Sequence, residues 1–406
     1  MQADAAVFSP SLTYSCFGVY DGHLGGPSTA ATLKGHLTQV LKLALADLYS
    51  HHSRISSKTG VDIASGYSFQ ERPQSKDPNV GKSQNPKPPG DEIDAVINGV
   101  FVALDNALVH RAAQYALGLS QTEYDALQGS RGNNQQTTSP SNLEFMKHIE
   151  ELYAQVLIPK ASSSKPSRAE AVNALANAYA GSCAVVAIYN NYERNLRVAL
   201  TGDCRAVLGR RVPIEEASKG TSGAFATNND HRYVYEVHKL TADHSPKNPT
   251  EAARVKSLHP DEPDLLKNDR YLGWGPTRAF GDGVMKWSIA IQTRLWEECL
   301  GDRPRKEEIY KTPPYFTAEP EITTFEDVRR GDFLILASDG LWDCLESEEV
   351  VGLVGKWLEE NGKAEVIKVA GKGETEIILP TNLAVQKEGP IKVQGEREKG
   401  GTVRPK

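Results

Sequence analysis

The stretch Cys16-Phe17-Gly18-Val19-Tyr20-Asp21-Gly22-His23-Leu24-Gly25-Gly26 sets the architecture expected of this chain. A short apolar run, rich in strand-forming residues, leads directly into an aspartate, a glycine and a histidine. Such a run predicts a buried strand whose far end places a carboxylate beside an imidazole. The glycines allow a sharp turn and let a metal or a phosphate approach the backbone closely. Taken alone, Asp-Gly is also the commonest hairpin turn.

A second stretch repeats this design with an apolar strand, an Asp-Gly pair and a turn: Asp332-Phe333-Leu334-Ile335-Leu336-Ala337-Ser338-Asp339-Gly340-Leu341-Trp342-Asp343. Two further stretches place an aspartate beside a glycine, at Gly202-Asp203 and at Gly281-Asp282. Strand ends and glycine turns thus deliver a set of carboxylates from distant parts of the chain: Asp21, Asp203, Asp282 and Asp339, with Asp343 one turn further on.

The chemistry of this set points to divalent metal ions. Any single Asp-Gly is more typical of a turn than of a metal ligand. Several carboxylates gathered together repel one another unless cations neutralise them. Hard oxygen ligands without cysteines or paired histidines favour Mg²⁺ or Mn²⁺ over zinc. Because a carboxylate-bound metal pair suits hydrolytic phosphoryl transfer, the residue types predict a metal-dependent hydrolase of a phosphate ester.

Composition excludes several other classes of protein. The chain has 406 residues, 39% of them hydrophobic, and can bury one large core or two modest ones. Its net charge of -6, from 46 basic and 52 acidic residues, argues against a nucleic-acid binder. Five scattered cysteines without a CxxC pair indicate neither a disulfide framework nor a zinc site, and favour a reducing compartment. No apolar run approaches the ~20 residues of a membrane helix, so no membrane span is expected.

Hydrophobic periodicity predicts helices at 28–49, 91–117 and 143–157. Strands are expected at 183–189, 196–200, 201–208, 233–240 and 321–325. Asn248 and Ser347 are typical helix caps, and Glu251 completes a box-like pattern after Asn248-Pro249. Polar insertions are expected near 60–90, 118–142 and 212–231, and a Ser-rich linker at 161–167. One-faced helices need a partner surface, and a sheet is the obvious one.

Six motifs, in order along residues 16–357, resemble those of the metal-dependent protein serine/threonine phosphatases of the PPM/PP2C family. They are Phe17-Gly-Val-Tyr-Asp-Gly-His23, Gly181-Ser-Cys-Ala184, Gly202-Asp-Cys-Arg-Ala-Val-Leu208, Leu240-Thr-Ala-Asp-His244, Arg278-Ala-Phe-Gly-Asp282 and Leu334-to-Asp343. The stretch 271–324, with Arg278-Ala-Phe-Gly-Asp-Gly-Val-Met-Lys-Trp-Ser288 and Thr312-Pro-Pro-Tyr-Phe-Thr-Ala-Glu-Pro-Glu321, resembles the pyruvate dehydrogenase phosphatase branch of that family.

The resemblance implies an α+β fold, a four-layer α-β-β-α sandwich of two antiparallel sheets flanked by helix pairs. The phosphatase domain would span 1–360 and an irregular tail 361–406. Family members carry a further strand before the Asp-Gly-His strand, with a metal-binding glutamate and a phosphate-binding arginine. Residues 1–15 contain neither residue type. Members also end in a strand with a metal-binding aspartate, and no Asp follows residue 361. We therefore expect a fold that is incomplete at both ends.

The resemblance also implies the roles of individual residues. Asp21 would bridge two Mg²⁺ or Mn²⁺ ions, the Gly22 carbonyl would bind the second and Asp339 the first. Asp203, with Asp339 and Asp343, would line a weaker third site. His23 would protonate the leaving serine or threonine oxygen, displaced by a metal-activated water without a phospho-enzyme intermediate.

Each of these residues also has a structural interpretation. His23 could simply bond a strand end, and Asp343 could cap the turn after Trp342. Asp282 is expected to fix a loop through Arg278 and to support the site rather than bind metal. His244 is expected to be structural, and Cys204 and Cys344 are expected to be small buried residues.

Three functions follow from these expectations. The leading one is hydrolysis of phosphoserine and phosphothreonine in proteins, with mitochondrial pyruvate dehydrogenase as the substrate and the matrix as the compartment that the branch implies. Residues 1–15 lack the arginines of a presequence, so the cytoplasm is the alternative. The runner-up is a catalytically impaired phosphatase-like module that binds phosphoproteins or a partner. A small-molecule phosphodiesterase would call for more histidine ligands.

Overall fold

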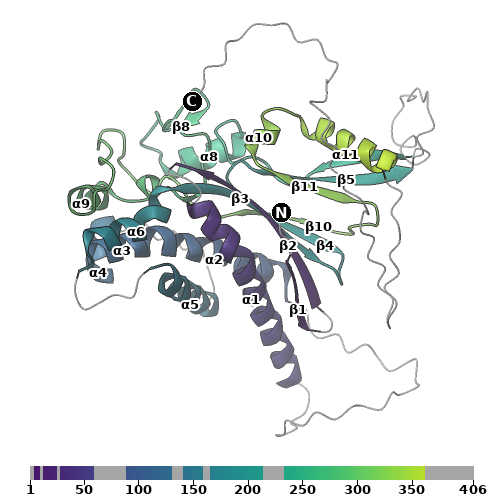
Figure 1. Cartoon of the computed structure of the whole chain (residues 1–406), viewed down its shortest axis with the longest axis horizontal. Coiled ribbons are helices and arrows are strands. Elements are labelled where there is room, and N and C mark those ends of the chain that lie inside the picture. The colour runs from purple at the N-terminus through teal and green to yellow at the C-terminus, as the bar shows by residue number, and fades with distance from the viewer. Residues whose placement is uncertain are drawn as a thin grey trace. The chain divides into compact units, whose positions relative to one another are not determined.

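A computed structural model shows the chain as helices packed on antiparallel sheets (Figure 1). It describes residues 4–9, 12–24, 28–58, 88–129, 140–158, 165–213 and 233–361. The insertions expected near 60–90 and 212–231, and the tail at 361–406, lie almost wholly outside the described residues. The chain divides into two units, Met1–Gly352 and Leu353–Lys406, and the account below concerns the first. The expected domain boundary at residue 360 stays a prediction.

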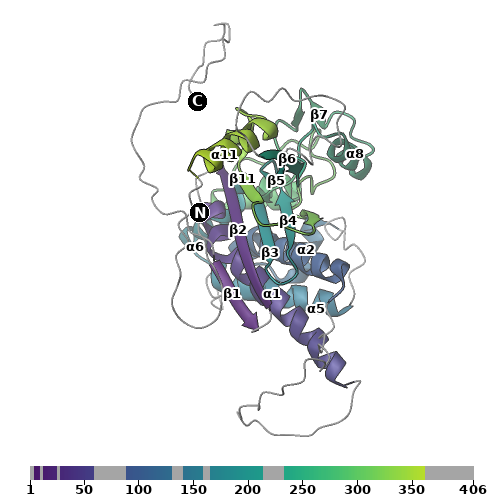
Figure 2. The same ribbon diagram turned by 90° about the vertical axis from the view of Figure 1, so that its right-hand side faces the viewer.

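The larger sheet brings the Asp-Gly-His stretch beside two glycine-containing strands. Its order is β1 (Asp4–Ser9), β2 (Leu12–His23), β3 (Gly181–Asn190), β4 (Asn195–Thr201) and β10 (Glu321–Phe325), all antiparallel, and Figure 2 shows the first four side by side. The register sets Asp21 opposite Cys183 and His23 opposite Gly181. A two-residue strand, β9 (Phe280–Gly281), pairs with β3 on the other side of Gly181.

The expectation that no strand precedes the Asp-Gly-His strand is wrong. β1 pairs with β2 from Asp4 opposite Cys16 to Ser9 opposite Leu12. Its Val7-Phe8 are strand formers, and Ser9-Pro10-Ser11 is a typical turn sequence, so a hairpin is the natural product of this stretch. β1 contains neither the glutamate nor the arginine that the family resemblance called for.

The smaller sheet consists of β11 (Phe333–Ala337), β5 (Arg205–Pro213) and β6 (Tyr233–Lys239), in that order and antiparallel. Side chains alternate between its two faces, as the period of a strand requires. Ala206 and Leu208 pack toward the larger sheet, in a cluster with Val185 and Val198. Val207 faces the opposite way.

Three separate apolar clusters define the layers of the sandwich. The first joins the helices to the outer face of the larger sheet through Ala184, Val186 and Ile188. The second lies between the two sheets. The third joins Val207 of the smaller sheet to Trp342, Val350 and Val351, which lie in α10 (Asp339–Trp342) and α11 (Ser347–Asn361). The fold is therefore the expected α+β arrangement of two antiparallel sheets with helices on both outer faces.

The helices predicted from periodicity are present. They are α1 (Ser28–Lys58), the continuous stretch formed by α2 (Gly90–Asn106), the π-helical turn η1 (Ala107–Arg111) and α3 (Ala112–Leu117), and α5 (Pro140–Leu157). In Figure 1 these helices lie together on one side of β2, β3 and β4. Their apolar stripes cover the larger sheet because only one side of each helix is apolar.

Besides the four-residue α10, three helices were not predicted: α4 (Gln121–Gln128), α6 (Arg168–Tyr179) and α9 (Ile289–Cys299). The stretch 118–142, expected to be a polar insertion, contains α4, which begins with a capping box between Ser120 and Glu123. Pattern analysis overlooked α6 because its buried face is mostly alanine, which gives a weak hydrophobic period.

In the sequence, the segment that connects β6 to β10 contains α8 (Pro249–Leu258) and a hairpin of β7 (Leu266–Lys267) and β8 (Arg270–Tyr271). The 3-10 turn η3 (Gly283–Met285) follows the hairpin. Asn248 caps α8 by accepting from the Thr250 N–H. Glu251 does not complete a capping box, because its carboxylate accepts hydrogen bonds from Arg254, Thr277 and Arg278.

One helical stretch in the described residues, Gly90–Leu117, is long and apolar enough to cross a membrane by length and composition. In the relevant window 61% of the stretch is buried inside the protein, which is the pattern of a core helix. Its buried side chains, among them Ile97, Val100 and Leu104, belong to the cluster beneath the larger sheet.

Candidate functional site

Three of the predicted carboxylates meet where strands of the two sheets end. Asp21 lies near the end of β2, Asp339 begins α10 directly after β11, and Asp203 lies in the turn between β4 and β5. Asp339 and Asp203 are both close enough to Asp21 to raise its pKa. Residues more than 300 positions apart in the sequence are therefore neighbours, as the metal-centre hypothesis requires.

The electrostatics of this cluster show negative charge that the charge of His23 offsets only in part. Burial, followed by Asp339 and Asp203, raises the pKa of Asp21 to about 6. Burial, together with the charge of Asp339, also raises the pKa of Asp203. No lysine or arginine is among the groups that chiefly set these two pKa values. In the described ranges, no group of three or more His, Cys, Asp or Glu side chains is placed so that it could hold a metal ion.

His23 pairs with Asp282 beside this cluster. Its Nε2 donates to Oδ2 of Asp282 at 2.7 Å. The imidazole is 29% exposed, whereas the Asp282 carboxylate is completely buried. Burial acts to lower the pKa of His23, but the hydrogen bond and charge of Asp282, with the charges of Asp203 and Asp21, outweigh it and raise the pKa. The site therefore presents to solvent an imidazole that keeps its proton more readily than usual.

Gly181 makes room for the His23–Asp282 pair, and Gly281 allows the close backbone packing directly before Asp282. A Cβ on Gly181 would lie 2.3 Å from the Nε2 of His23 and 2.3 Å from both carboxylate oxygens of Asp282. Gly281 has a φ of +71°, and a Cβ there would lie 2.0 Å from the Ala180 carbonyl oxygen. The lack of space excludes a side chain at both positions, and the left-handed backbone excludes one at Gly281 as well. This accounts for the glycines that open one motif and precede Asp282 in another.

The turn that carries Asp203 is fixed by His244. The buried imidazole accepts a hydrogen bond from the backbone N–H of Gly202 at 3.1 Å. The backbone N–H of His244 donates in turn to the Gly202 carbonyl at 2.9 Å. Burial is the largest cause of the lowered pKa of His244, so the ring stays neutral and can accept. Gly202 has a φ of +107°, and a Cβ there would lie 2.3 Å from the Cys183 sulfur. His244 therefore has a structural role, as expected.

Two expectations about neighbouring residues are wrong. Arg278 does not hold Asp282: its guanidinium donates to both oxygens of Glu251, at 2.9 and 2.8 Å, and to the Glu319 carbonyl at 3.0 Å. The two residues lie in one motif, but they serve different partners. Cys344 is exposed rather than buried, whereas Cys204 is buried.

Asp343 lies on the exposed side of the site, at the end of α10. Its N–H donates to the Asp339 carbonyl at 2.7 Å, so backbone contact links it to the carboxylate cluster. Gly22 is also exposed, next to Asp21. Both are therefore open to solvent beside the cluster in which they were expected to act.

Two side chains near the site were not anticipated. The ring of Trp274 meets that of His23 edge-on, with centroids 6.1 Å apart. Arg270, in β8, is exposed, and its Nη1 lies 3.2 Å from the position of a Cβ on Gly275, which itself lies 3.8 Å from an Asp203 oxygen. In the sequence, only the glycines of the stretch 270–287 pointed to these two side chains, because glycine lets other groups approach the backbone closely.

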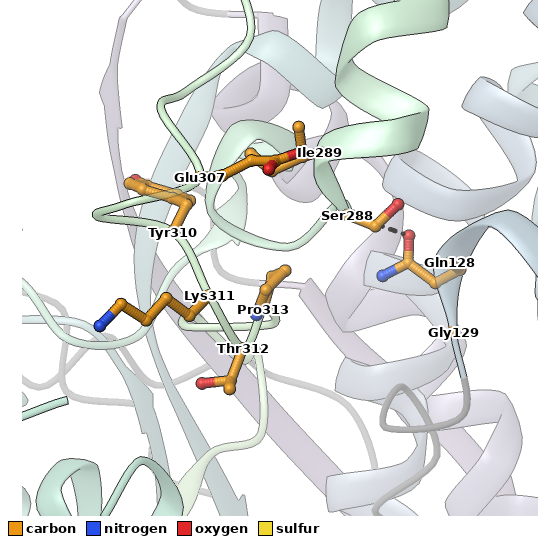
Figure 3. A pocket seen from close by; sticks show the side chains of 9 residues that line it. All are labelled: Gln128, Gly129, Ser288, Ile289, Glu307, Tyr310, Lys311, Thr312 and Pro313. Carbon is orange, nitrogen blue, oxygen red and sulfur yellow. Dashed lines mark hydrogen bonds between the residues drawn. The ribbon is translucent and has the colours of Figure 1, made fainter. Parts of the chain in front are cut away.

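A cavity of about 620 Å³ lies apart from these residues (Figure 3). None of the residues that line it belongs to the carboxylate cluster or to the His23–Asp282 pair. Its wall includes a hydrogen bond from the Ser288 N–H to the side chain of Gln128, at 3.2 Å. The lining residues are Gln128, Gly129, Ser288, Ile289, Glu307, Tyr310, Lys311, Thr312 and Pro313.

The chain is similar to several proteins of known family. A protein phosphatase 2C homologue of Schizosaccharomyces pombe is 38% identical over 233 residues, 55% of this chain and 48% of that protein. The mitochondrial [pyruvate dehydrogenase [acetyl-transferring]]-phosphatase 1 of Saccharomyces cerevisiae is 26% identical over 361 residues, 87% of this chain and 46% of that protein. The human protein of the same name is 37% identical over 203 residues, 48% of this chain and 34% of that protein.

The chain thus spans less than half the length of each of these three relatives. The family model described as Protein phosphatase 2C matches residues 98–372, more than half of the chain. That match includes Asp203, Asp282 and Asp339 and begins after Asp21 and His23, which the structure brings to the same place. The chain belongs to the protein phosphatase 2C family.

Proposed function

We propose that this chain hydrolyses phosphoserine and phosphothreonine in proteins with the help of Mg²⁺ or Mn²⁺. The observation that carries the proposal is the proximity of Asp21, Asp339 and Asp203, whose charges act on one another beside the His23–Asp282 pair. This combines a place for divalent cations with a proton donor. Membership of the protein phosphatase 2C family supports the same reaction.

The carboxylate cluster fits a divalent cation by its chemistry. Burial, Asp339 and Asp203 together raise the pKa of Asp21 to about 6, and a divalent cation would offset the negative charge gathered there. Asp21, the Gly22 carbonyl and Asp339 would hold two ions, and Asp203 and Asp343 would line a weaker third position. Mg²⁺ commonly keeps several waters and needs only one or two carboxylates from the protein. When bound, such ions activate water and offset the charge of the phosphate oxygens.

His23 would supply the proton that the leaving group needs. As the phosphorus–oxygen bond breaks, its electron pair goes to the serine or threonine oxygen, which must take up a proton to leave as an alcohol. Asp282 holds Nε2 of His23, which leaves Nδ1 for the substrate. Water supplies the hydroxyl that stays on phosphorus, and its remaining proton restores His23. Because the Asp282 carboxylate is buried and close, it orients the ring and stabilises its charged form.

The substrate is proposed from the relatives. Two of the three similar proteins described above are named as phosphatases of pyruvate dehydrogenase and as mitochondrial. We therefore propose phosphorylated pyruvate dehydrogenase as the substrate and partner, and the mitochondrial matrix as the place of action. The third relative is named only as a protein phosphatase 2C homologue, which fits a phosphoprotein substrate without specifying one.

The test is phosphate release from a phosphoserine peptide with and without Mn²⁺, combined with calorimetric titration of Mn²⁺. Asp21→Asn should lower the rate of Mn²⁺-dependent phosphate release about a hundredfold or more and weaken Mn²⁺ binding. Asp264→Asn, at a site 81% exposed and outside the cluster, is the matched control and should change neither. Release that persists in a chelator, or equal activity of the two variants, would contradict the proposal. Peptide binding without release would favour the impaired binding module.

A further inference from the structure

An ion pair is buried in the core behind the site. Nζ of Lys286 lies 2.7 and 2.6 Å from the two carboxylate oxygens of Asp105, which belongs to α2. Asp105 is 5% exposed and Lys286 1%. Removing both charges from water is costly, and apolar residues of similar volume are often at least as stable as such a pair. Stability alone therefore gives a weak reason for this pair to be here.

The pair holds the backbone that carries Asp282. Oδ1 of Asp105 accepts from the Gly281 N–H at 2.9 Å, and Nζ of Lys286 donates to the Ala279 carbonyl at 2.8 Å. These contacts fix the two residues on either side of Phe280, directly before Asp282. Asp282 itself has a φ of 48°, in the left-handed region, where a residue other than glycine persists only if its surroundings impose it.

The segment after Asp282 is anchored to η1 and to α4. The Trp287 indole N–H donates to the Val109 carbonyl at 3.3 Å, at the π-helical turn η1 that follows α2. The side chain of Gln128 donates to the Lys286 carbonyl at 2.8 Å. Lys286 is thus held through its backbone as well as its ammonium group, and Asp282 lies in a loop fixed on both sides.

We propose that Asp105 and Lys286 are positioning residues, which set the place of His23 through Gly281 and Asp282. The proposal rests on the proposed function, since it gives His23 the proton of the leaving group. The connection is short: Asp105 accepts from Gly281, Gly281 precedes Asp282, and Asp282 accepts from His23. A shift of this loop would move the Asp282 carboxylate, and the imidazole would lose the partner that orients it.

Two substrates with different leaving groups can distinguish a positioning role of Asp105 and Lys286 from a general structural role. A serine oxygen needs a proton to leave, whereas p-nitrophenolate is stable as an anion and needs none. The readout is therefore the ratio of kcat on a phosphoserine peptide to kcat on p-nitrophenyl phosphate, both with Mn²⁺. Displacing His23 lowers this ratio, while a loss of folded protein or of metal lowers both rates together.

Two double variants differ only in the acceptor for Gly281. Asp105→Leu with Lys286→Met removes both charges and the acceptor. Asp105→Asn with Lys286→Met also removes the charges but keeps an oxygen for the Gly281 N–H. We expect the leucine variant to lower the ratio about tenfold or more, with the p-nitrophenyl phosphate rate within about twofold of the unaltered chain. The asparagine variant should keep the ratio within about threefold.

The control is a partly buried ion pair away from the site, Arg210 with Asp332, at 2.9 Å between β5 and the start of β11. Arg210→Met with Asp332→Asn should leave the ratio unchanged. If the leucine variant fails to fold, Asp105→Ser with Lys286→Met is the second test, because the serine side chain is too short for its oxygen to reach the Gly281 N–H.

An unchanged ratio in the folded leucine or serine variant overturns the proposal. So does the failure of both to fold while the asparagine variant folds, since the pair is then purely structural. If the unaltered chain hydrolyses neither substrate with Mn²⁺, the proposed function fails instead.

Discussion

Gly181 shows how much of this site depends on one missing side chain. Gly181→Ala would place a Cβ 2.3 Å from His23 Nε2 and from both oxygens of Asp282. We expect the pair to separate and phosphoserine hydrolysis to fall on the order of a hundredfold, because general acid catalysis contributes about that much. Overpacking should lower the unfolding free energy by about 1 to 3 kcal/mol. Steady-state kinetics and urea unfolding measure the two effects.

Gly35→Ala is the control for this substitution. Gly35 lies in α1 and a Cβ there would meet nothing within 4 Å, so alanine should raise stability by about 0.5 to 1 kcal/mol through its better helix propensity. The activity should not change. A Gly181→Ala enzyme with full activity would mean that His23 and Asp282 do not work as a pair.

Single residues were predictable from the sequence where their chemistry is local. Asp21, Asp203 and Asp339 stand next to a glycine at the end of a strand or turn, and the structure gathers them. The partner of Asp282 was not predictable in this way, since His23 is 259 positions away and Arg278 in the same motif was the nearer choice. Asp105 was overlooked because a single acidic residue in an amphipathic helix usually faces solvent.

Among the elements, α6 is indicated in the sequence by the residues that cap its first turn and not by a hydrophobic period along its length. Ser167 accepts from the Glu170 N–H, and Glu170 accepts from the Ser167 N–H, which satisfies two backbone donors that the helix leaves free. The helices that were predicted have leucine, isoleucine and valine on one face. The buried side of α6 is mainly alanine, so only the cap could have revealed it.

Ser167→Ala should therefore destabilise the protein by about 1 kcal/mol, because the hydroxyl that caps α6 is lost. α6 buries Ala171, Ala174, Leu175 and Ala178, so its first turn is coupled to the core. The matched variant is Ser120→Ala, which removes the same capping box from α4, a helix that buries only Tyr124 among the residues in its span. We expect a smaller loss there. Urea unfolding of both variants decides the order, and equal losses would contradict this account.

For the whole molecule, the layers were predicted from the family resemblance. Strands such as 183–189 and 333–337 are apolar on both faces, which fits sheets that are covered on each side. The cross-connections between layers were not readable from the sequence. Glu251 of α8 binds Arg278, far along the chain, and this contact fixes the segment that leads to Asp282.

This buried network should make the whole fold sensitive to acid. Burial acts to raise the pKa of Glu251, but hydrogen bonds from Arg278 and Arg254 outweigh it and hold the pKa well below its ordinary value of 4.5. The unfolded chain therefore takes up this proton first as the pH falls. The stabilisation from Glu251 is complete above the unfolded pKa and is lost as the pH drops from about 5 toward the folded pKa.

Glu251→Gln should remove this dependence. At pH 7 the variant should unfold about 3 to 5 kcal/mol more easily, because it leaves Arg278 without its buried partner. Between pH 6 and pH 2 the unaltered chain should lose on the order of 2 to 3 kcal/mol more than the variant, so that their unfolding free energies converge. Glu297→Gln, at an exposed position of α9, is the control and should run parallel to the unaltered chain. Urea unfolding at a series of pH values gives all three curves. A constant gap between Glu251→Gln and the unaltered chain would show that Glu251 binds its proton equally well in both states.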